Sequence, residues 1–241
     1  MRYFSTILSL TTCAFLGSAC SSDDADGTLL ITAYGESYIE DGIPGAEVDD
    51  GWAVHFEHFK VTIEDVIVGE EKLTNIDVVD LTKKSSGDGQ QLGALLLPAG
   101  KYTDASFAIT QVEVEGEASK GKEKKTFHWI FDRPTEYTKC EATSTITNAE
   151  ADTLQITVHA DHLLYDSLVA EEPSLLFGPL AAADADDDGE ITQEELKKAD
   201  IGAYDPGSDD GVDDLWAYLS ALSTTLGHVN GEGHCSSRAT D

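Results

Sequence analysis

Hydrophobic and polar residues alternate in short runs over the first two thirds of the chain, and turn residues separate the runs. Leu154, Ile156 and Val158 share one face of an extended segment, while Gln155 and Thr157 share the other. This period of two is typical of strands with one buried face. The runs that predict strands are Leu29–Tyr34, Trp52–Val68, Asn75–Leu81, Leu92–Leu97, Tyr102–Val114, Lys125–Phe131 and Thr153–His159.

Short strands at regular spacing predict an antiparallel β-sandwich over residues 28–160. In the run that ends at Phe131, Phe127 and Trp129 occupy the same face as Phe131. The turn Leu97-Pro98-Ala99-Gly100-Lys101-Tyr102, followed by an alternating strand, is similar to prealbumin-like and immunoglobulin-like surface modules of bacteria. That resemblance implies a fold and no activity.

The hydrophobic period lengthens after His162, and residues 161–226 are expected to form a helical segment. Leu163–Val169 and Leu196–Ile201 are candidate short helices, and the Gly178-Pro179 pair shortens the helix expected before residue 184. A last helix is predicted from leucines at helical spacing, Leu215, Leu219, Leu222 and Leu226. The fold class is thus mostly β with a C-terminal helical segment, and residues 227–241 form a tail rich in Gly and His.

A twelve-residue stretch, Asp184 to Glu195, has the donor pattern of a calcium loop. Ca²⁺ needs six to eight oxygen ligands at about 2.3–2.6 Å, and glycine at position six makes the sharp turn around the ion. Gly189 occupies that position. The loop resembles the EF-hand family, which implies one calcium site with these ligands: Asp184, Asp186, Asp188, Glu190 (through its carbonyl), Thr192 and Glu195. The alternative is an acidic turn with a capping box at Thr192–Glu195.

EF-hands usually occur in pairs, and Asp205-Pro206-Gly207-Ser208-Asp209-Asp210-Gly211 is a second acidic turn. Its spacing does not fit, because Gly211 falls at position seven and Trp216 at position twelve, where a bidentate Glu is needed. The turn is better explained as an N-cap for the Leu215–Leu226 helix. The calcium site is therefore expected to be structural.

Composition limits the class of partner. The chain of 241 residues has 46 acidic and 15 basic residues, for a net charge of −31. Such a surface repels nucleic acid and anionic lipid while it attracts divalent cations, so no nucleic-acid partner is expected. A protein or glycan partner stays unknown.

Residues 1–19 have the pattern of an export signal: Arg2, an apolar run, and Gly17-Ser18-Ala19 before Cys20. Cys20 resembles the lipidated cysteine of a bacterial lipobox, although Leu16 lies one place too early, so ordinary cleavage and secretion remain an alternative. Residues 20–27 would form an acidic tether. The protein is then expected at the outer membrane, in the periplasm or at the cell surface, held to the membrane only by its lipid. No later run reaches the roughly 20 apolar residues of a membrane span.

Cysteine parity supports lipidation of Cys20. Cys13 leaves with the signal, and Cys140 and Cys235 remain as an even pair suited to one disulfide in an oxidising compartment.

Histidines provide a second candidate metal site, for Zn²⁺ or Cu²⁺. His159 and His162 end the last predicted strand, and His228 and His234 lie in the tail. The first two face the same way only if the backbone turns after the strand. The alternative is a set of hydrogen-bonded histidines beside a Cys140–Cys235 disulfide, and a metal-bound Cys235 would exclude that disulfide.

Catalytic motifs are not found. The segment 116–123 nearly matches a phosphate-binding loop, but Glu123 replaces the Ser or Thr that holds Mg²⁺, so it is expected to be a charged hairpin tip. The function predicted from the sequence is an exported calcium-binding lipoprotein that is not an enzyme. The alternative is a protein that binds or handles a transition metal, and a surface hydrolase is a third possibility.

Overall fold

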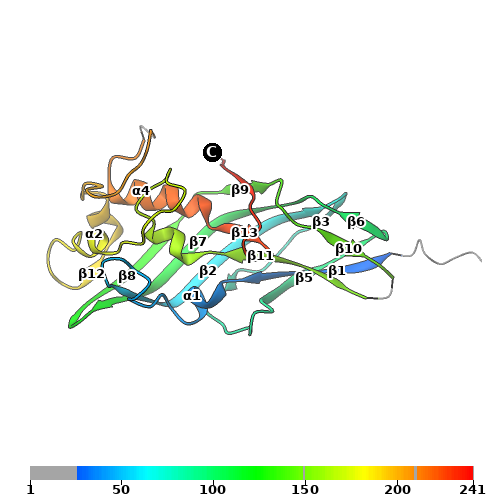
Figure 1. Cartoon of the computed structure of the whole chain (residues 1–241), viewed down its shortest axis with the longest axis horizontal. Helices are drawn as coiled ribbons and strands as arrows, with labels where there is room; N and C mark the ends of the chain where they lie inside the picture. Colours follow the sequence, from blue (N-terminus) through cyan, green and yellow to red (C-terminus); the bar gives the residue numbers. More distant parts are fainter. Residues whose placement is uncertain (1–25, 149, 209–210, 241) are drawn as a thin grey trace, which may run out of the picture.

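The protein is mostly β in the computed structural model, which describes residues 26–148, 150–208 and 211–240. Strands account for 45% of the structure and helices for 14%. Two sheets run along the long axis of the molecule, and most of the short helices gather at one end (Figure 1). The sheets are not closed. The predicted signal (1–19), Cys20 and most of the tether lie outside the described residues.

The smaller sheet has the strand order β13-β11-β1-β5. Its strands are β1 (Gly27–Tyr34), β5 (Gln90–Leu97), β11 (Asp152–Val158) and β13 (Gly227–Val229), and the short helix α1 (Glu36–Glu40) follows β1. β1 pairs with β11 in parallel, whereas its pairing with β5 and that of β11 with β13 are antiparallel. The sheet is therefore mixed, and strands far apart in sequence meet at its centre.

The larger sheet is built on two 16-residue strands, β2 (Ala53–Val68) and β7 (Ala105–Lys120), which pair antiparallel along their length. Its order is β12-β8-β7-β2-β3, with β4, β9 and β14 attached. A two-stranded sheet pairs β6 (Gly100–Tyr102) with β10 (Ser144–Ile146). The remaining strands are β3 (Glu71–Leu73), β4 (Val79–Asp80), β8 (Glu123–Phe131), β9 (Thr135–Thr138), β12 (Glu190–Ile191) and β14 (Ser236–Ala239).

One hydrophobic core joins both sheets to the helical segment. Leu29 of β1, Phe59 of β2 and Leu219 of the last helix are fully buried members of the same cluster. Burial of each such side chain contributes about 1.5–3 kcal/mol. The predicted helical segment and tail thus pack on the core of the sheets.

The helices are short. They are η2 (Ala160–Leu164), α2 (Gly178–Ala181), α3 (Gln193–Leu196), α4 (Leu215–Leu222) and η3 (Ser223–Thr225). Pro179 lies in the first turn of α2, where it needs no hydrogen-bond donor, and α2 is one turn long. The helix expected at Leu163–Val169 is not formed: the 3₁₀ turn η2 ends at Leu164, and residues 165–169 are not helical. Asp214, just after the second acidic turn, caps α4 by accepting a hydrogen bond from the Ala217 amide at 2.8 Å.

Most predicted strands are present, with two changes. The run Asn75–Leu81 forms only the two residues of β4. The run Tyr102–Val114 breaks after Tyr102, and β7 continues to Lys120, so the hairpin tip shrinks to Gly121 and Lys122. Long-range pairing with β2 and β8 extends the ladder into a segment whose charged composition predicts a loop.

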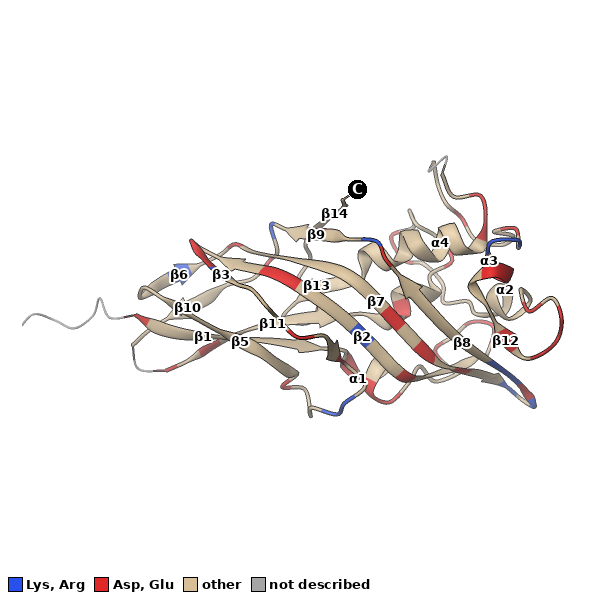
Figure 2. Cartoon of the chain, turned by 180° about the vertical axis from the view of Figure 1, so that it is seen from behind, with Lys and Arg blue, Asp and Glu red and all other residues tan. Residues whose placement is uncertain are grey.

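Charge is unevenly distributed. Acidic side chains mark β2, β7 and the end near α3 and β12, while basic side chains gather at the β7–β8 tip (Figure 2). Within the described part of the chain, no helix is long and apolar enough to span a bilayer.

Candidate metal centre

Four histidines meet beside the smaller sheet, and β11 with β13 positions two of them. In the antiparallel pair β11–β13, His228 lies opposite Thr157. His159 follows β11 by one residue, and its amide donates to the Leu226 carbonyl at 3.0 Å, so the ladder continues. His159 and His228 are therefore diagonal neighbours on one face of the sheet, a separation that aromatic rings bridge. Their ring centroids are 4.3 Å apart.

The 3₁₀ turn η2 brings His162 to the same place. Residues three apart eclipse one another in a 3₁₀ helix, and His159 is the N-cap of η2. The rings of His159 and His162 are 5.3 Å apart, and those of His162 and His228 are 5.2 Å apart. The backbone turn that the sequence required for these two histidines to face the same way is thus present.

A tight hairpin in the tail adds His234. Val229 and Gly233 exchange two backbone hydrogen bonds of 2.9 Å, which places His234 opposite His228, with ring centroids 5.4 Å apart. A Cβ on Gly233 would lie 2.4 Å from the Val229 carbonyl oxygen, so only glycine allows this approach. Asn230, in the connecting loop, has a positive φ of 51°.

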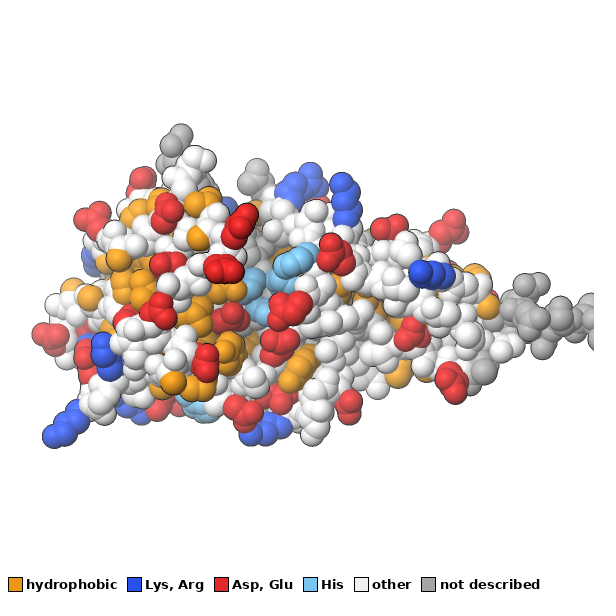
Figure 3. All heavy atoms as spheres, viewed as in Figure 1, with side chains coloured by type: hydrophobic (Ala, Val, Ile, Leu, Met, Phe, Trp, Pro, Cys, Tyr) orange, Lys and Arg blue, Asp and Glu red, His pale blue; other side chains and the backbone are white. Residues whose placement is uncertain are grey.

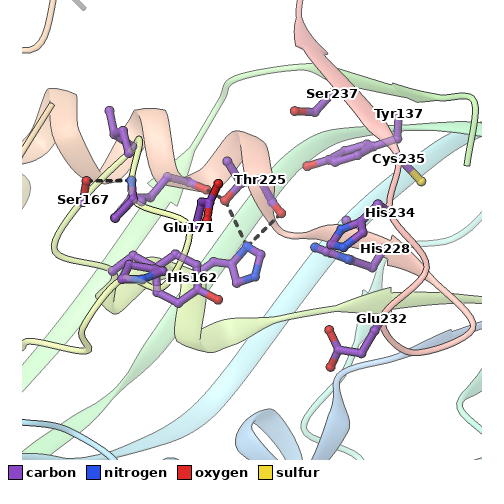
Figure 4. Close-up of a pocket in the computed structure, with 16 residues that line it drawn as sticks. Tyr137, His162, Ser167, Glu171, Thr225, His228, Glu232, His234, Cys235 and Ser237 are labelled. Carbon is purple, nitrogen blue, oxygen red and sulfur yellow. Dashed lines mark hydrogen bonds between the residues drawn. The ribbon is translucent and has the colours of Figure 1, made fainter. Parts of the chain in front are cut away.

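We call the four histidines the histidine cluster (His159, His162, His228 and His234), and three of them, all except His159, line a cavity of about 370 Å³. His162, His228, His234 and Glu232 all line the cavity (Figure 4). Histidine side chains reach the surface in the middle of one face, with acidic side chains around them (Figure 3). The centre is therefore open to solutes on one side.

Donor atoms in the cluster lie close enough to share an ion. One set consists of His159, His228 and Glu232, and a second of His159, Asp161 and His162. In each set one ligand atom per residue lies within 4.8 Å of the others. Ligands around a tetrahedral ion at about 2.0–2.1 Å approach one another to about 3.4 Å, so the three donors of a set would have to move closer together to hold an ion. Glu232 is exposed, so its carboxylate has room to move toward the two histidines of its set.

Hydrogen bonds determine which imidazole nitrogens have free lone pairs. The Nδ1 of His162 lies 2.9 Å from the Thr225 carbonyl, which can only accept, so this nitrogen carries the proton and Nε2 has the lone pair. The buried Nδ1 of His228 has no hydrogen-bond partner. A buried nitrogen without a partner destabilises the fold, and a metal ion would satisfy it.

Two histidines of the cluster, His162 and His228, have lowered pKa values. Burial, helped by the charge of His159, lowers the pKa of His162 to about 4. Burial and the neighbouring histidines also lower the pKa of His228 to about 4. Both rings are therefore neutral at pH 7, the form that binds metals. An acidic group lies beside the cluster. The Glu36 carboxylate is 3.7 Å from Nδ1 of His159, and burial raises the pKa of Glu36.

The calcium-like loop lies at the other candidate centre, against the larger sheet. Gly189 has a positive φ of 91°, as position six of such a loop requires. Asp184, Asp186 and Glu195 each place a carboxylate oxygen within 4.8 Å of the others. The carboxylates of Asp188 and Glu190 do not belong to this group, whereas the Thr192 hydroxyl lies 2.7 Å from Oε2 of Glu195. The Oδ1 atom of Asp184 is buried and has no hydrogen-bond partner.

Protein groups already bind several oxygens of this loop. The Glu195 carboxylate accepts from the Thr192 amide and hydroxyl at 2.9 and 2.7 Å and from the Ala185 amide at 2.9 Å. The capping box is thus present. These bonds, led by the Thr192 amide, lower the pKa of Glu195. The Lys125 ammonium, 2.6 Å from Oδ2 of Asp184, is the main cause of the lowered pKa of that carboxyl.

The predicted cysteine pair forms the disulfide Cys140–Cys235. Cys235 directly follows His234 and lines the cavity. The His234 carbonyl accepts from the Glu141 amide at 2.8 Å, so the tail is fastened to the chain before β10 at His234 itself and, through the disulfide, at the next residue. Cys235 is therefore a structural anchor of the centre.

Two residues of these centres were not predicted from the sequence. Glu232 is one of many acids, and its only local signal is the Asn230-Gly231 turn that precedes it. Lys125 opens the alternating run Lys125–Phe131 on the face of Phe127, an inward position for which the sequence predicts an apolar side chain.

Comparison with known proteins gives no family for this chain: no family model matches it, and no curated protein and no solved structure shows significant similarity to it.

Proposed function

We propose that the protein binds a transition-metal ion, Zn²⁺ or Cu²⁺, through the histidine cluster. One observation carries this proposal: histidines from two distant segments converge, and the buried Nδ1 of His228 has no other partner. Neutral imidazoles with a carboxylate are the donor set that suits Zn²⁺ and Cu²⁺. His159, His228 and Glu232 would hold the ion, while His162 and His234 complete the wall around it.

The surroundings favour uptake of a cation. Glu36, Asp161 and Glu171 lie near the cluster or line its cavity, and the whole chain has a net charge of −31. Such a field raises the local concentration of divalent cations. These features support a metal-binding role, and no motif recognised in the sequence points to a catalysed reaction.

The test is metal analysis of protein purified without chelators, followed by titration with Cu²⁺ and Zn²⁺. The wild type should bind one equivalent, and His228→Ala should lose it. His128→Ala is the matched control, because His128 is an exposed histidine on β8, outside the cluster. Equal binding by the His228 variant, or none by the wild type, would overturn the proposal.

We propose calcium binding at Asp184–Glu195 as a second function of structural kind. The buried Oδ1 of Asp184, which has no partner, favours it, as does the approach of Asp186 and Glu195. The ion would fasten the loop, whose strand β12 already pairs with β8. This interpretation extends to the fold: the two sheets form a β-sandwich, and α2 and α3 are the shortened helices of an EF-hand.

Calorimetric titration with Ca²⁺ tests this second site. Glu195→Gln is a suitable variant, because glutamine keeps the capping box while it removes the charged bidentate ligand. Calcium heat in the wild type and its loss in this variant are expected. Equal heats would contradict the site.

We also propose that the protein is exported and lipidated at Cys20. The Cys140–Cys235 disulfide supports an oxidising compartment, and it leaves Cys20 as the one cysteine without a partner after signal cleavage. Mass spectrometry of the mature N-terminus, with and without a Cys20→Ser change, is the direct measurement. An unmodified cysteine would leave plain secretion.

A further inference from the structure

Lys125 occupies an unusual position for a lysine. Along β8, residues 125, 127, 129 and 131 point inward, and three of them are Phe127, Trp129 and Phe131. Lys125 is only 9% exposed, like its aromatic neighbours. Lysine is almost never buried without a partner, so the contact of its ammonium requires an explanation.

The partner of that ammonium is the first ligand of the calcium-like loop. Nζ of Lys125 lies 2.6 Å from Oδ2 of Asp184, whose side chain has no exposed surface. The same Oδ2 accepts from the Gly189 amide at 3.0 Å. A single positive charge is thus held on the carboxylate from which a bound calcium ion would be coordinated.

The backbone fixes this arrangement. β12 runs parallel to β8 with Glu190 beside Thr126, and the Thr126 amide donates to the Gly189 carbonyl at 2.8 Å. The indole of Trp129 donates to the Ile191 carbonyl, also at 2.8 Å. These bonds hold the loop against the strand that carries Lys125, so rotation of the lysine side chain is enough to separate its ammonium from Asp184.

We propose that Lys125 is a built-in competitor of calcium: its ammonium neutralises Asp184 in the ion-free loop, and Ca²⁺ binds only when this side chain withdraws. The inference rests on the proposed calcium site. Two cations cannot share one buried carboxylate without strong repulsion, because charges interact strongly where water is excluded. Lys125 thereby keeps the loop folded when calcium is scarce and restricts occupancy to high calcium concentration.

The test is Ca²⁺ titration of the disulfide-bonded protein and of Lys125→Met, with Lys124→Met as the matched control. Both changes remove one positive charge from adjacent residues of β8, but Lys124 is exposed and pairs with Glu117. Loss of Lys125 should tighten calcium binding about tenfold, a repulsion of about 1.4 kcal/mol. Loss of Lys124 should change it by about twofold at most. Lys125→Gln, which keeps a hydrogen-bond donor, repeats the measurement if the Met variant folds poorly.

The outcomes separate the inference from the site on which it rests. Unchanged or weaker calcium binding by the Lys125 variants, beside measurable binding by the wild type, overturns the competitor and leaves the calcium site. No calcium binding by any of the proteins overturns both. Equal tightening by the Lys124 and Lys125 changes also overturns the competitor, because a general effect of charge then explains the result.

Discussion

The imidazoles of His159 and His228 lie 4.3 Å apart between centroids, as diagonal neighbours across β11 and β13. The pairing of these two strands thus does more than any local motif to bring the rings of the histidine cluster together. Three predictions concern the residues that complete this centre, and a fourth concerns the stability of the larger sheet.

Glu232→Gln should weaken Cu²⁺ or Zn²⁺ binding by about tenfold, because a neutral amide replaces a charged ligand. Glu171→Gln is the control, since Glu171 lines the same cavity but belongs to neither ligand set. Titration of both variants decides whether Glu232 is a ligand. An equal loss of affinity in the two variants would mean that the negative charge of the cavity, and not ligation by Glu232, causes the effect.

Gly233→Ala should reduce metal binding and stability together. Its Cβ would collide with the Val229 carbonyl and open the hairpin that holds His234, at a cost of about 1–3 kcal/mol. Gly100→Ala, where the nearest atoms lie 3.9 Å away, is the control for loss of a strand glycine. Urea unfolding and metal titration of the two variants provide the comparison. Normal metal affinity in Gly233→Ala would show that the hairpin is not needed to position the metal ligands.

The double change Cys140→Ser and Cys235→Ser should lower the free energy of unfolding by about 2–5 kcal/mol. The disulfide closes a loop between residues separated by 95 positions, so its removal releases much chain entropy in the unfolded state. Metal affinity should fall as well, because the residue next to His234 is no longer held by the disulfide. Urea unfolding measures the first effect and titration of the folded variant the second. Full affinity without the disulfide would show that the hairpin alone positions His234.

Acid should remove stability contributed by Asp80 on β4. Burial raises the pKa of Asp80, but hydrogen bonds from His58, from the Thr82 hydroxyl and from the amides of Thr82 and Phe59 outweigh it, so the folded pKa is lower than 3.8. A lowered pKa means that the carboxylate stabilises the fold above pH 3.8 and loses this contribution as the pH falls through the folded value.

Urea unfolding from pH 7 to pH 2.5 checks this for Asp80→Asn. The stability difference from the wild type should be largest near pH 7 and should shrink below about pH 4. Asp77→Asn, at an exposed position of the same segment, should show no such trend. A difference that stays constant with pH would mean that the carboxylate charge at residue 80 contributes nothing.

Alternation was enough to predict β8 and β11, because their alternate apolar residues lie in the core. β2 and β5 were predicted as β-rich runs between turn residues. It could not predict the parallel pairing of β1 with β11, since strand partners depend on contacts between distant segments. Composition was misleading at residues 116–120, where charged side chains occupy a long hairpin with one buried face.

The candidate sites also have features that the sequence predicts and features that depend on contacts between distant segments. The donor spacing from Asp184 to Glu195 is local, and the sequence contains it. Parity predicted the Cys140–Cys235 pair. The four histidines could be named as candidate ligands from the sequence, but whether their rings lie close together depends on the register of β11, β13 and the tail. Alternation places Lys125 on the inward face of β8, but its partner was missed because Asp184 lies 59 residues further along the chain.

The parallel pairing of β1 with β11 has a consequence for the order in which the chain matures. The first strand gains its central partner only after residue 158 has been synthesised, and β13, with His228, is added later still. Folding therefore depends on contacts of high sequence separation, which form slowly. A nascent or truncated chain that ends before residue 227 has only two of the four imidazoles. Metal capture at the histidine cluster would thus report that the chain has been synthesised through His234.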